Sequence, residues 1–122
     1  MPNPNPPASD PAAQPASAPA AMGSAAILPT IRSPHDLRKL PVEALEQVAR
    51  EMRDAICAQI AVSGGHLAPN LGVVELSIAL HYVFDFAHDR LLFDVGHQCY
   101  PHKLLTGRLD KLSKLRTREG MA

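Results

Sequence analysis

The longest regular pattern of hydrophobic and polar positions lies between Pro41 and Ser63. Its apolar residues recur every three or four positions, the spacing of one face of an amphipathic α-helix; they are Val42, Leu45, Val48, Ala49, Met52, Ile56 and Ile60. Glu46 and Arg50 lie on the polar face, four positions apart, where they form a modestly stabilising pair. The pattern predicts a helix that begins at Pro41 and ends at the glycines after Ser63.

Shorter helices are predicted on both sides of this one. Ser33 and Pro34 are typical of an N-cap and a first helical position, so a short helix should run to about residue 40. Pro101 opens another short helix, to about residue 106, which Gly107 closes. Residues 110–117 indicate a weaker, basic helix.

The stretch 71–84 is apolar nearly all round, and Asn70 can cap it, so it predicts a third helix that is normally buried inside a larger protein. Residues 85–89 form a predicted turn. Residues 91–95 (Leu-Leu-Phe-Asp-Val) are typical of a short buried strand, ended by Gly96. One strand cannot form a sheet, and about 90 residues offer little partner surface for the apolar helix. We therefore expect the front piece of a larger α/β protein, mostly helical, with one short strand.

Residues 1–29 are dominated by Pro, Ala, Ser and Asn, and Asp10 is their only charge. This composition cannot offset the entropy of ordering, so we expect a disordered tail, with the folded part in residues 30–122. The tail lacks the basic start and apolar core of a secretory signal, and the first arginine, Arg32, comes too late for a transit peptide. No run is long enough for a transmembrane span. The expected location is the cytoplasm.

The charge balance and the cysteine content argue against two classes of function, nucleic-acid binding and metal binding by cysteine. Lys plus Arg equals Asp plus Glu, so nothing attracts the chain strongly to nucleic acid. Cys57 and Cys99 fit no metal-binding spacing and are expected to be reduced thiols.

Candidate chemistry is concentrated in residues 63–103, which hold five of the six histidines. His66 and His97 each follow a glycine, and glycine permits tight turns and close approach to a ligand. The two turns bracket the helix 71–84, so a single polar site containing both histidines is predicted, although on the residues alone each could be a turn histidine without a role.

The remaining polar residues of this stretch are assigned more ordinary places. His81 is expected to be a hydrogen-bonded core histidine and His88 a surface turn residue. His102 and Lys103 either approach a phosphate or simply begin a helix, and both interpretations stay open. A metal site from His97 and His102 lacks a third ligand of convincing spacing. Glu75 is expected to be a buried carboxylate with a structural partner.

Several motifs in order resemble the 1-deoxy-D-xylulose-5-phosphate synthase family. They are Ser-Gly-Gly-His-Leu-Ala-Pro-Asn-Leu-Gly-Val-Val-Glu-Leu at 63–76, His-Tyr-Val-Phe-Asp at 81–85, Asp-Val-Gly-His-Gln-Cys-Tyr-Pro-His-Lys at 94–103 and Thr-Gly-Arg at 106–108. Residues 31–41 also resemble the start of those enzymes. The resemblance implies a transketolase-like, thiamine-diphosphate-binding domain. The family condenses pyruvate with glyceraldehyde 3-phosphate, releasing carbon dioxide, and needs thiamine diphosphate and Mg²⁺.

The resemblance also implies roles for the two histidines. His66 matches the active-site histidine near the thiazolium and acceptor substrate, suited to proton transfer, and His97 lies near the cofactor diphosphate. The Gly-Asp-Gly…Asn motif that holds Mg²⁺, the activating glutamate and most of the homodimer surface do not occur in residues 1–122, so the metal ligands are expected outside this chain. The chain alone is expected to be inactive. The alternatives are a non-catalytic binding or interaction protein, or a piece of another transketolase-like enzyme; an in-frame continuation with Gly-Asp-Gly would separate them.

Overall fold

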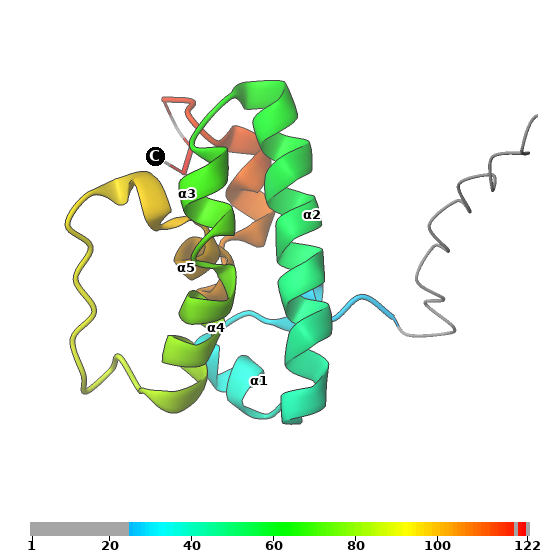
Figure 1. Cartoon of the computed structure of the whole chain (residues 1–122), viewed down its shortest axis with the longest axis vertical. Helices are drawn as coiled ribbons and strands as arrows, with labels where there is room; N and C mark the ends of the chain where they lie inside the picture. The colour runs from blue at the N-terminus through cyan, green and yellow to red at the C-terminus, as the bar shows by residue number, and fades with distance from the viewer. Residues whose placement is uncertain (1–24, 119, 122) are drawn as a thin grey trace, which may run out of the picture.

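The helix α2 (Leu45–Ser63) is the element against which the other helices pack (Figure 1). The computed structural model describes residues 25–118, 120 and 121. Four residues of the predicted apolar face are buried: Val48, Ala49, Met52 and Ile56. The predicted helix is therefore confirmed, although its first turn is a separate 3-10 helix, η2 (Val42–Ala44), in which Val42 is 64% exposed.

The remaining helices are short and surround α2. They are η1 (Leu28–Thr30), α1 (Pro34–Arg38), α3 (Leu67–Leu71), α4 (Val74–Val83), η3 (Gly96–Gln98), α5 (Tyr100–Leu105) and η4 (Leu109–Lys114). The helices predicted from Pro34 and Pro101 are confirmed. Gly107 closes α5 with a φ of 85°, a conformation that favours glycine. The weaker helix predicted for residues 110–117 is instead the 3-10 helix η4.

The helix predicted for residues 71–84 is confirmed as α4, but its start and its environment differ from the prediction. It begins at Val74, after a break at Gly72 and Val73; Leu71 ends the separate helix α3, and Asn70 lies inside α3 rather than capping a helix. The physical reason is that the Asn70 amide is fully buried and bonds to groups distant in sequence. Nor is α4 buried all round, because Leu76 and Val83 are 56% and 71% exposed.

The strand predicted for residues 91–95 is also wrong. No strand occurs in the described residues, which are mostly helical, so the α/β class is not observed. A strand requires a partner backbone, and none lies beside residues 91–95 in the described part of the chain. The residues instead form part of a loop that runs outside α4 and returns into η3 (Figure 1).

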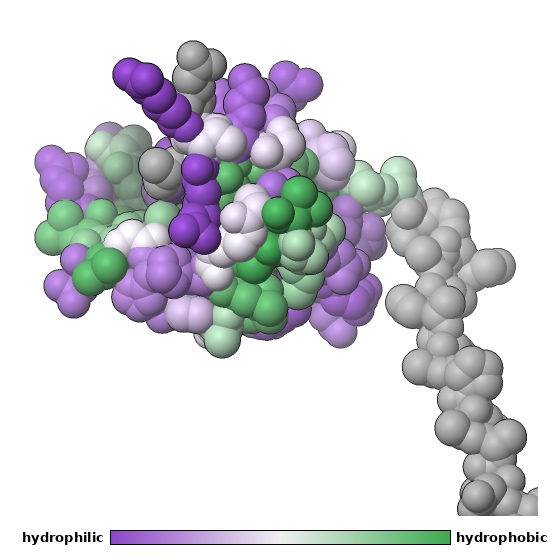
Figure 2. All heavy atoms as spheres, turned by 90° about the horizontal axis from the view of Figure 1, so that it is seen from above, coloured by the Kyte–Doolittle hydropathy of each residue, from purple (hydrophilic) through white to green (hydrophobic). Residues whose placement is uncertain are grey.

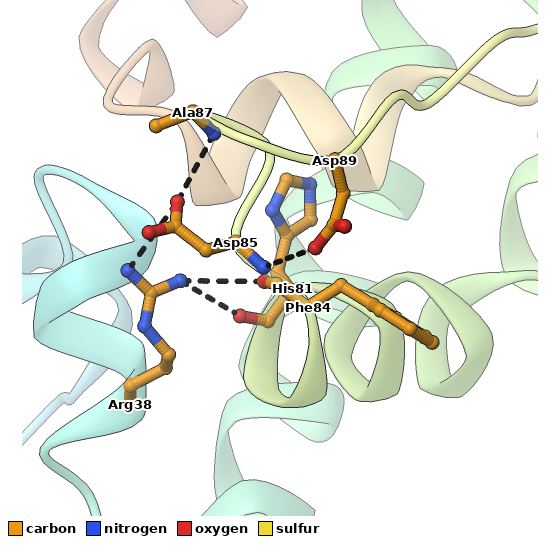
Figure 3. Close-up of polar contacts among 6 residues, drawn as sticks. All are labelled: Arg38, His81, Phe84, Asp85, Ala87 and Asp89. Carbon is orange, nitrogen blue, oxygen red and sulfur yellow. Dashed lines mark hydrogen bonds and ion pairs between the residues drawn. The ribbon is translucent and has the colours of Figure 1, made fainter.

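The start of this loop is held by Arg38 of α1 (Figure 3). The Arg38 guanidinium donates to the carbonyl oxygens of His81 and Phe84, at 3.3 and 3.4 Å. These two carbonyls lie at the end of α4 and have no further partner within the helix. It also lies 4.0 Å from the Asp85 carboxylate, which accepts a hydrogen bond from Ala87 N–H. These contacts fix the predicted turn 85–89, where His88 and Asp89 N–H groups donate to the Asp85 carbonyl.

The prediction of a disordered tail over residues 1–29 can be compared with the structure only for residues 25–29, because residues 1–24 lie outside the described part. Residues 25–29 do not fit that prediction. Leu28 is buried, and the Glu51 carboxylate accepts hydrogen bonds from Ile27 and Leu28 N–H groups. Both cysteines are free thiols, Cys57 exposed and Cys99 buried. Among the helices described, none has the length and apolar content required to cross a bilayer.

Candidate functional site

The first predicted site residue, His66, lies directly after a glycine turn. Gly64 and Gly65 have φ angles of 69° and 139°, both in the region that favours glycine, and His66 is the N-cap residue of α3. A Cβ at Gly65 would lie 3.0 Å from the Tyr100 hydroxyl oxygen, so this glycine also permits the turn to approach α5 closely. The local sequence thus directs the chain back towards α5 and leaves the His66 side chain exposed.

The second predicted site residue, His97, lies at the centre of η3 and is half-buried. Its ring centroid is 6.1 Å from that of His66, in an edge-to-face arrangement. The two histidines predicted to share a site are therefore adjacent in space, although 31 positions separate them in the chain.

Asn70 connects the two histidine segments through a fully buried amide. Its Nδ2 donates to the carbonyl oxygens of His66 and His97 at 2.6 and 2.8 Å, and its Oδ1 accepts from Tyr100 N–H at 2.9 Å. One side chain thereby fixes the backbone of α3, η3 and α5 relative to one another. This role of Asn70 was not predicted from the sequence. Asparagine is unfavourable inside a helix, and its presence in an otherwise apolar run was the available signal.

Both histidines line one hollow of about 590 Å³. Its other walls are apolar side chains, the two glycine turns and one cation: Gly65, Val95, Gly96, Tyr100, Leu115, Arg116 and Met121. Arg116 is held in a left-handed conformation, φ 63°, and its Nη1 would lie 3.0 Å from a Cβ at Gly64. Sequence reasoning did not single out Arg116, because it lies in a basic segment without a recognisable motif.

The chemistry of this hollow suits an anionic group attached to an apolar one. Two imidazoles can donate hydrogen bonds, and a guanidinium is suited to phosphate oxygens. A Cβ at Gly96 would meet only the Cys99 sulfur, at 3.9 Å, so glycine here leaves open space rather than preventing a clash. The volume is within the range of small-molecule sites. In residues 25–118, 120 and 121, no three His, Cys, Asp or Glu side chains are grouped to hold a metal ion.

A second histidine pair lies on the other side of His97. The buried His81 has its Nε2 2.9 Å from Nδ1 of His102, and the two rings are stacked. Burial lowers the pKa of His81 to about 4, and the nearby His102 and Arg38 contribute less to this shift. Burial, followed by Arg108 and Lys103, also lowers the pKa of His102. Both rings are therefore neutral at physiological pH.

This pair corrects the prediction for His81 in one detail. It is a core histidine, but its buried Nδ1 has no hydrogen-bond partner among the described residues. His102 lies within α5 and contacts His81, which favours the structural interpretation of His102. The pair, together with His97, lines a separate hollow of about 270 Å³.

The outlying polar residues mostly have the predicted places. His88 is exposed on its turn. Glu75 pairs with Arg53 as expected, which lowers the pKa of the Glu75 carboxyl, but the expectation of burial is wrong because the Glu75 side chain is 64% exposed. Glu46 and Arg50 form the predicted surface pair at 3.1 Å.

Comparison with protein-family models places this geometry in context. Residues 28–122 match the family described as 1-deoxy-D-xylulose-5-phosphate synthase. The match includes every residue of the hollow, and it covers more than three-quarters of the chain.

Proposed function

Because this chain belongs to the 1-deoxy-D-xylulose-5-phosphate synthase family, we propose that it contributes His66 and His97 to the active site of such a synthase. The family consists of thiamine-diphosphate-dependent transferases that use pyruvate and glyceraldehyde 3-phosphate. The reaction proposed for the protein containing this chain releases carbon dioxide and gives 1-deoxy-D-xylulose 5-phosphate for isoprenoid, thiamine and pyridoxal synthesis. The observation that supports the proposal is the convergence of His66 and His97 on one hollow, held by Asn70.

His97 is proposed to bind the cofactor. Its half-buried ring lies at the wall of the hollow, where an imidazole N–H can donate to a diphosphate oxygen. Arg116, on the same wall, supplies a positive charge for the same group. When bound, thiamine diphosphate supplies the nucleophilic carbon of its thiazolium ring.

His66 is proposed to act as a catalytic residue. Its ring is exposed at the mouth of the hollow and is positioned by a turn that only glycines permit. An exposed imidazole beside the cofactor can hold or transfer a proton on the acceptor substrate. The edge-to-face contact with His97 keeps the two rings at a defined separation, so binding and proton transfer are assigned to different side chains.

The rest of the proposal concerns the longer protein. The Mg²⁺ ligands, the glutamate that activates the cofactor and the homodimer surface are proposed to lie outside residues 1–122, in an α/β domain of transketolase type. The proposed location is the cytoplasm. The family match favours this synthase over another transketolase-like enzyme.

The test uses His97→Ala and His66→Ala, each in an intact member of the family that carries this segment. His97→Ala should weaken thiamine diphosphate binding by about 1.5–3 kcal/mol, the value of a hydrogen bond to a charged group. His66→Ala should leave cofactor affinity unchanged while turnover at saturating cofactor falls by about 10²–10⁴-fold. Cofactor affinity is measured by calorimetric titration and turnover by pyruvate-dependent release of carbon dioxide.

His88→Ala is the matched control, because His88 is exposed on a turn and lines neither histidine hollow. It should change neither quantity. Unchanged cofactor affinity in His97→Ala, or normal turnover in His66→Ala, removes the corresponding role. The isolated 122-residue chain, assayed with cofactor, Mg²⁺ and both substrates, should show no turnover, and robust turnover would contradict the placement of essential groups outside it.

A further inference from the structure

The hollow of about 270 Å³ between α4 and the loop that follows it, here called the loop hollow, is not used by the function proposed above. Its walls come from α4, the loop and α5, and the lining is mainly apolar, including Leu76, Leu80, Leu91, Leu92 and Phe93. It shares Val95 and His97 with the hollow that contains His66. The rest of its lining belongs to it alone, so it is a separate candidate site.

The outer wall of the loop hollow is held in place. At the start of the loop, Arg38 donates to the two carbonyls at the end of α4 (Figure 3). At its end, the Asn70 amide holds the His97 carbonyl. Between these points the Phe93 ring lies 5.2 Å from the ring of His102. Because the loop is fixed at three places, a ligand pays little to order it.

Much of the apolar surface at the loop hollow is uncovered. Leu76 and Leu92 are 56% and 89% exposed, and Phe93 is 38% exposed. Figure 2 shows hydrophobic side chains at the surface on the side of the molecule where this loop lies. Covering them stabilises a bound molecule in proportion to the area removed from water. An apolar cavity of about 150 Å³ holds benzene, so the loop hollow accommodates a single substituted ring.

One polar side chain in the wall lacks a partner. Ser77 is 6% exposed, and its hydroxyl forms no hydrogen bond to any residue that the structure describes. Among those residues, His81 Nδ1 is the single polar side-chain atom that is both sealed from water and unpaired. Ser77 Oγ is unpaired but not sealed, so it opens into the loop hollow that it lines. It can donate to a ligand or accept from one.

His102 provides a second polar group. Its Nδ1 lies 2.9 Å from His81 Nε2, and its Nε2 has no partner among the described residues. The sealed His81 Nδ1 favours the tautomer in which it carries a lone pair, because a buried N–H without an acceptor is rarer than an acceptor without a donor. In that tautomer His81 Nε2–H donates to His102 Nδ1, and the proton of His102 is on Nε2. A ligand hydroxyl can therefore accept from His102 and donate to Ser77.

The charges around the loop hollow favour a neutral ligand. No described Lys or Arg lines it, and the acidic residue of its lining, Asp94, is exposed. An anion would meet no opposite charge there. A cation would lose its hydration against mainly apolar walls. This sets the loop hollow apart from the hollow that contains Arg116, which suits an anionic group.

We propose that the loop hollow is a binding site for a small, neutral, flat ring that carries one hydroxyl group, the chemical class of the phenols. The ring packs on Leu76 and Phe93, and the hydroxyl donates to Ser77 and accepts from His102. The inference goes beyond the synthase function, because it needs neither thiamine diphosphate nor the roles proposed for His66 and His97.

The experiment titrates the isotopically labelled 122-residue chain with 4-methylphenol, followed by two-dimensional proton–nitrogen NMR. Saturable shifts are expected in residues 76–80 and 91–102, with a dissociation constant below about 1 mM. Toluene has the same flat, apolar ring without the hydroxyl, so it should bind about three- to tenfold more weakly, the loss of one neutral hydrogen bond. Benzoate, an anion of similar size, should not bind.

Two variants locate the site. Ser77→Ala should weaken 4-methylphenol binding by about three- to tenfold and leave toluene binding unchanged. Its control is Ser113→Ala, on η4, because Ser113 is exposed and lines neither histidine hollow. Leu76→Trp should fill the loop hollow and abolish binding of both rings. Its control is Leu67→Trp, on α3, because Leu67 is 39% exposed and lines neither histidine hollow.

Circular dichroism of each variant checks that its fold is kept. Absence of saturable 4-methylphenol binding up to about 5 mM overturns the proposal. So do equal affinities for 4-methylphenol and toluene, shifts confined to the hollow of His66 and Arg116, or binding that Leu76→Trp leaves unchanged. If Ser77→Ala fails to fold, the comparison of the three probes on the unaltered chain still tests recognition of the hydroxyl.

Discussion

Replacing Asn70 by alanine tests how the candidate site is held together. Asn70 is fully buried, and its amide makes three hydrogen bonds to backbone groups of His66, His97 and Tyr100. The Asn70→Ala variant leaves the His97 carbonyl and Tyr100 N–H without a partner, whereas the His66 carbonyl, as the N-cap carbonyl of α3, keeps its intrahelical bond. An unpaired buried polar group costs about 1–3 kcal/mol. Water that enters from the exposed His66 side replaces some of the lost hydrogen bonds, so we expect a loss of about 3–5 kcal/mol in the free energy of unfolding.

That loss is large compared with the roughly 5–15 kcal/mol by which a domain is stable. Urea unfolding followed by far-ultraviolet circular dichroism measures it. Gln47→Ala is the matched control, because it removes an amide with one exposed hydrogen bond, of 3.2 Å, to the Ala25 carbonyl. The control should lose at most about 0.5 kcal/mol.

Asn70→Asp adds a distinguishing result. The carboxylate keeps an acceptor for Tyr100 N–H but points its second oxygen at the His66 and His97 carbonyls, so it should destabilise at neutral pH at least as much as alanine does. Protonation at low pH restores one donor and should recover part of the stability relative to Asn70→Ala. A loss below about 1 kcal/mol in Asn70→Ala, or no difference between the two variants at low pH, would refute the assigned role.

Two further predictions concern pH and backbone conformation. The folded chain keeps His81 neutral to about pH 4, whereas the unfolded chain protonates it near 6.5, so the free energy of unfolding should fall by up to about 3 kcal/mol as the pH decreases through this window. Urea titrations at several pH values should show that this dependence on pH is reduced in His81→Gln and retained in the control His88→Gln. An unchanged pH dependence in His81→Gln would contradict the prediction. At Gly107, φ is 85° and a Cβ would lie 2.3 Å from the Arg32 carbonyl oxygen, so Gly107→Ala should lower the melting temperature of the chain. Gly72→Ala is the control, because Gly72 has a φ of −66° that alanine can adopt, and it should not lower the melting temperature. Equal effects of the two substitutions would refute the argument.

The amphipathic helix α2 and the capped short helices α1 and α5 could be predicted because their signals are local. Periodic apolar positions determine which face of α2 is buried, and prolines and glycines mark where the short helices begin and end. The adjacency of His66 and His97 was predicted from the two glycine turns that bracket one apolar stretch, and the contact between their rings confirms it. The family was identified from motifs in the same stretch, and the family match confirms it.

The late start of α4 and the separate helix α3 before it could not be predicted, because they depend on groups distant in the chain. The periodicity of residues 71–84 favours one helix, but the buried Asn70 amide donates to the His97 carbonyl of η3 and accepts from Tyr100 N–H of α5, and those bonds hold α3 as a separate short helix. Arg116 became part of the site for a similar reason. Its position beside the Gly64 turn depends on the path of the chain after η4, which no local pattern specifies.

The sequence by itself determined α1, α2 and α5, the glycine turns, the pair of histidines and the family, since each rests on the spacing of neighbouring residues. The tertiary structure decided the state of residues 91–95 and the environment of His81. An apolar, β-branched or aromatic run becomes a strand only when another backbone pairs with it, and in the described residues none does. Likewise, a histidine becomes a neutral core residue only when packing removes water from its ring, and that packing involves α1, α5 and the loop as well as α4.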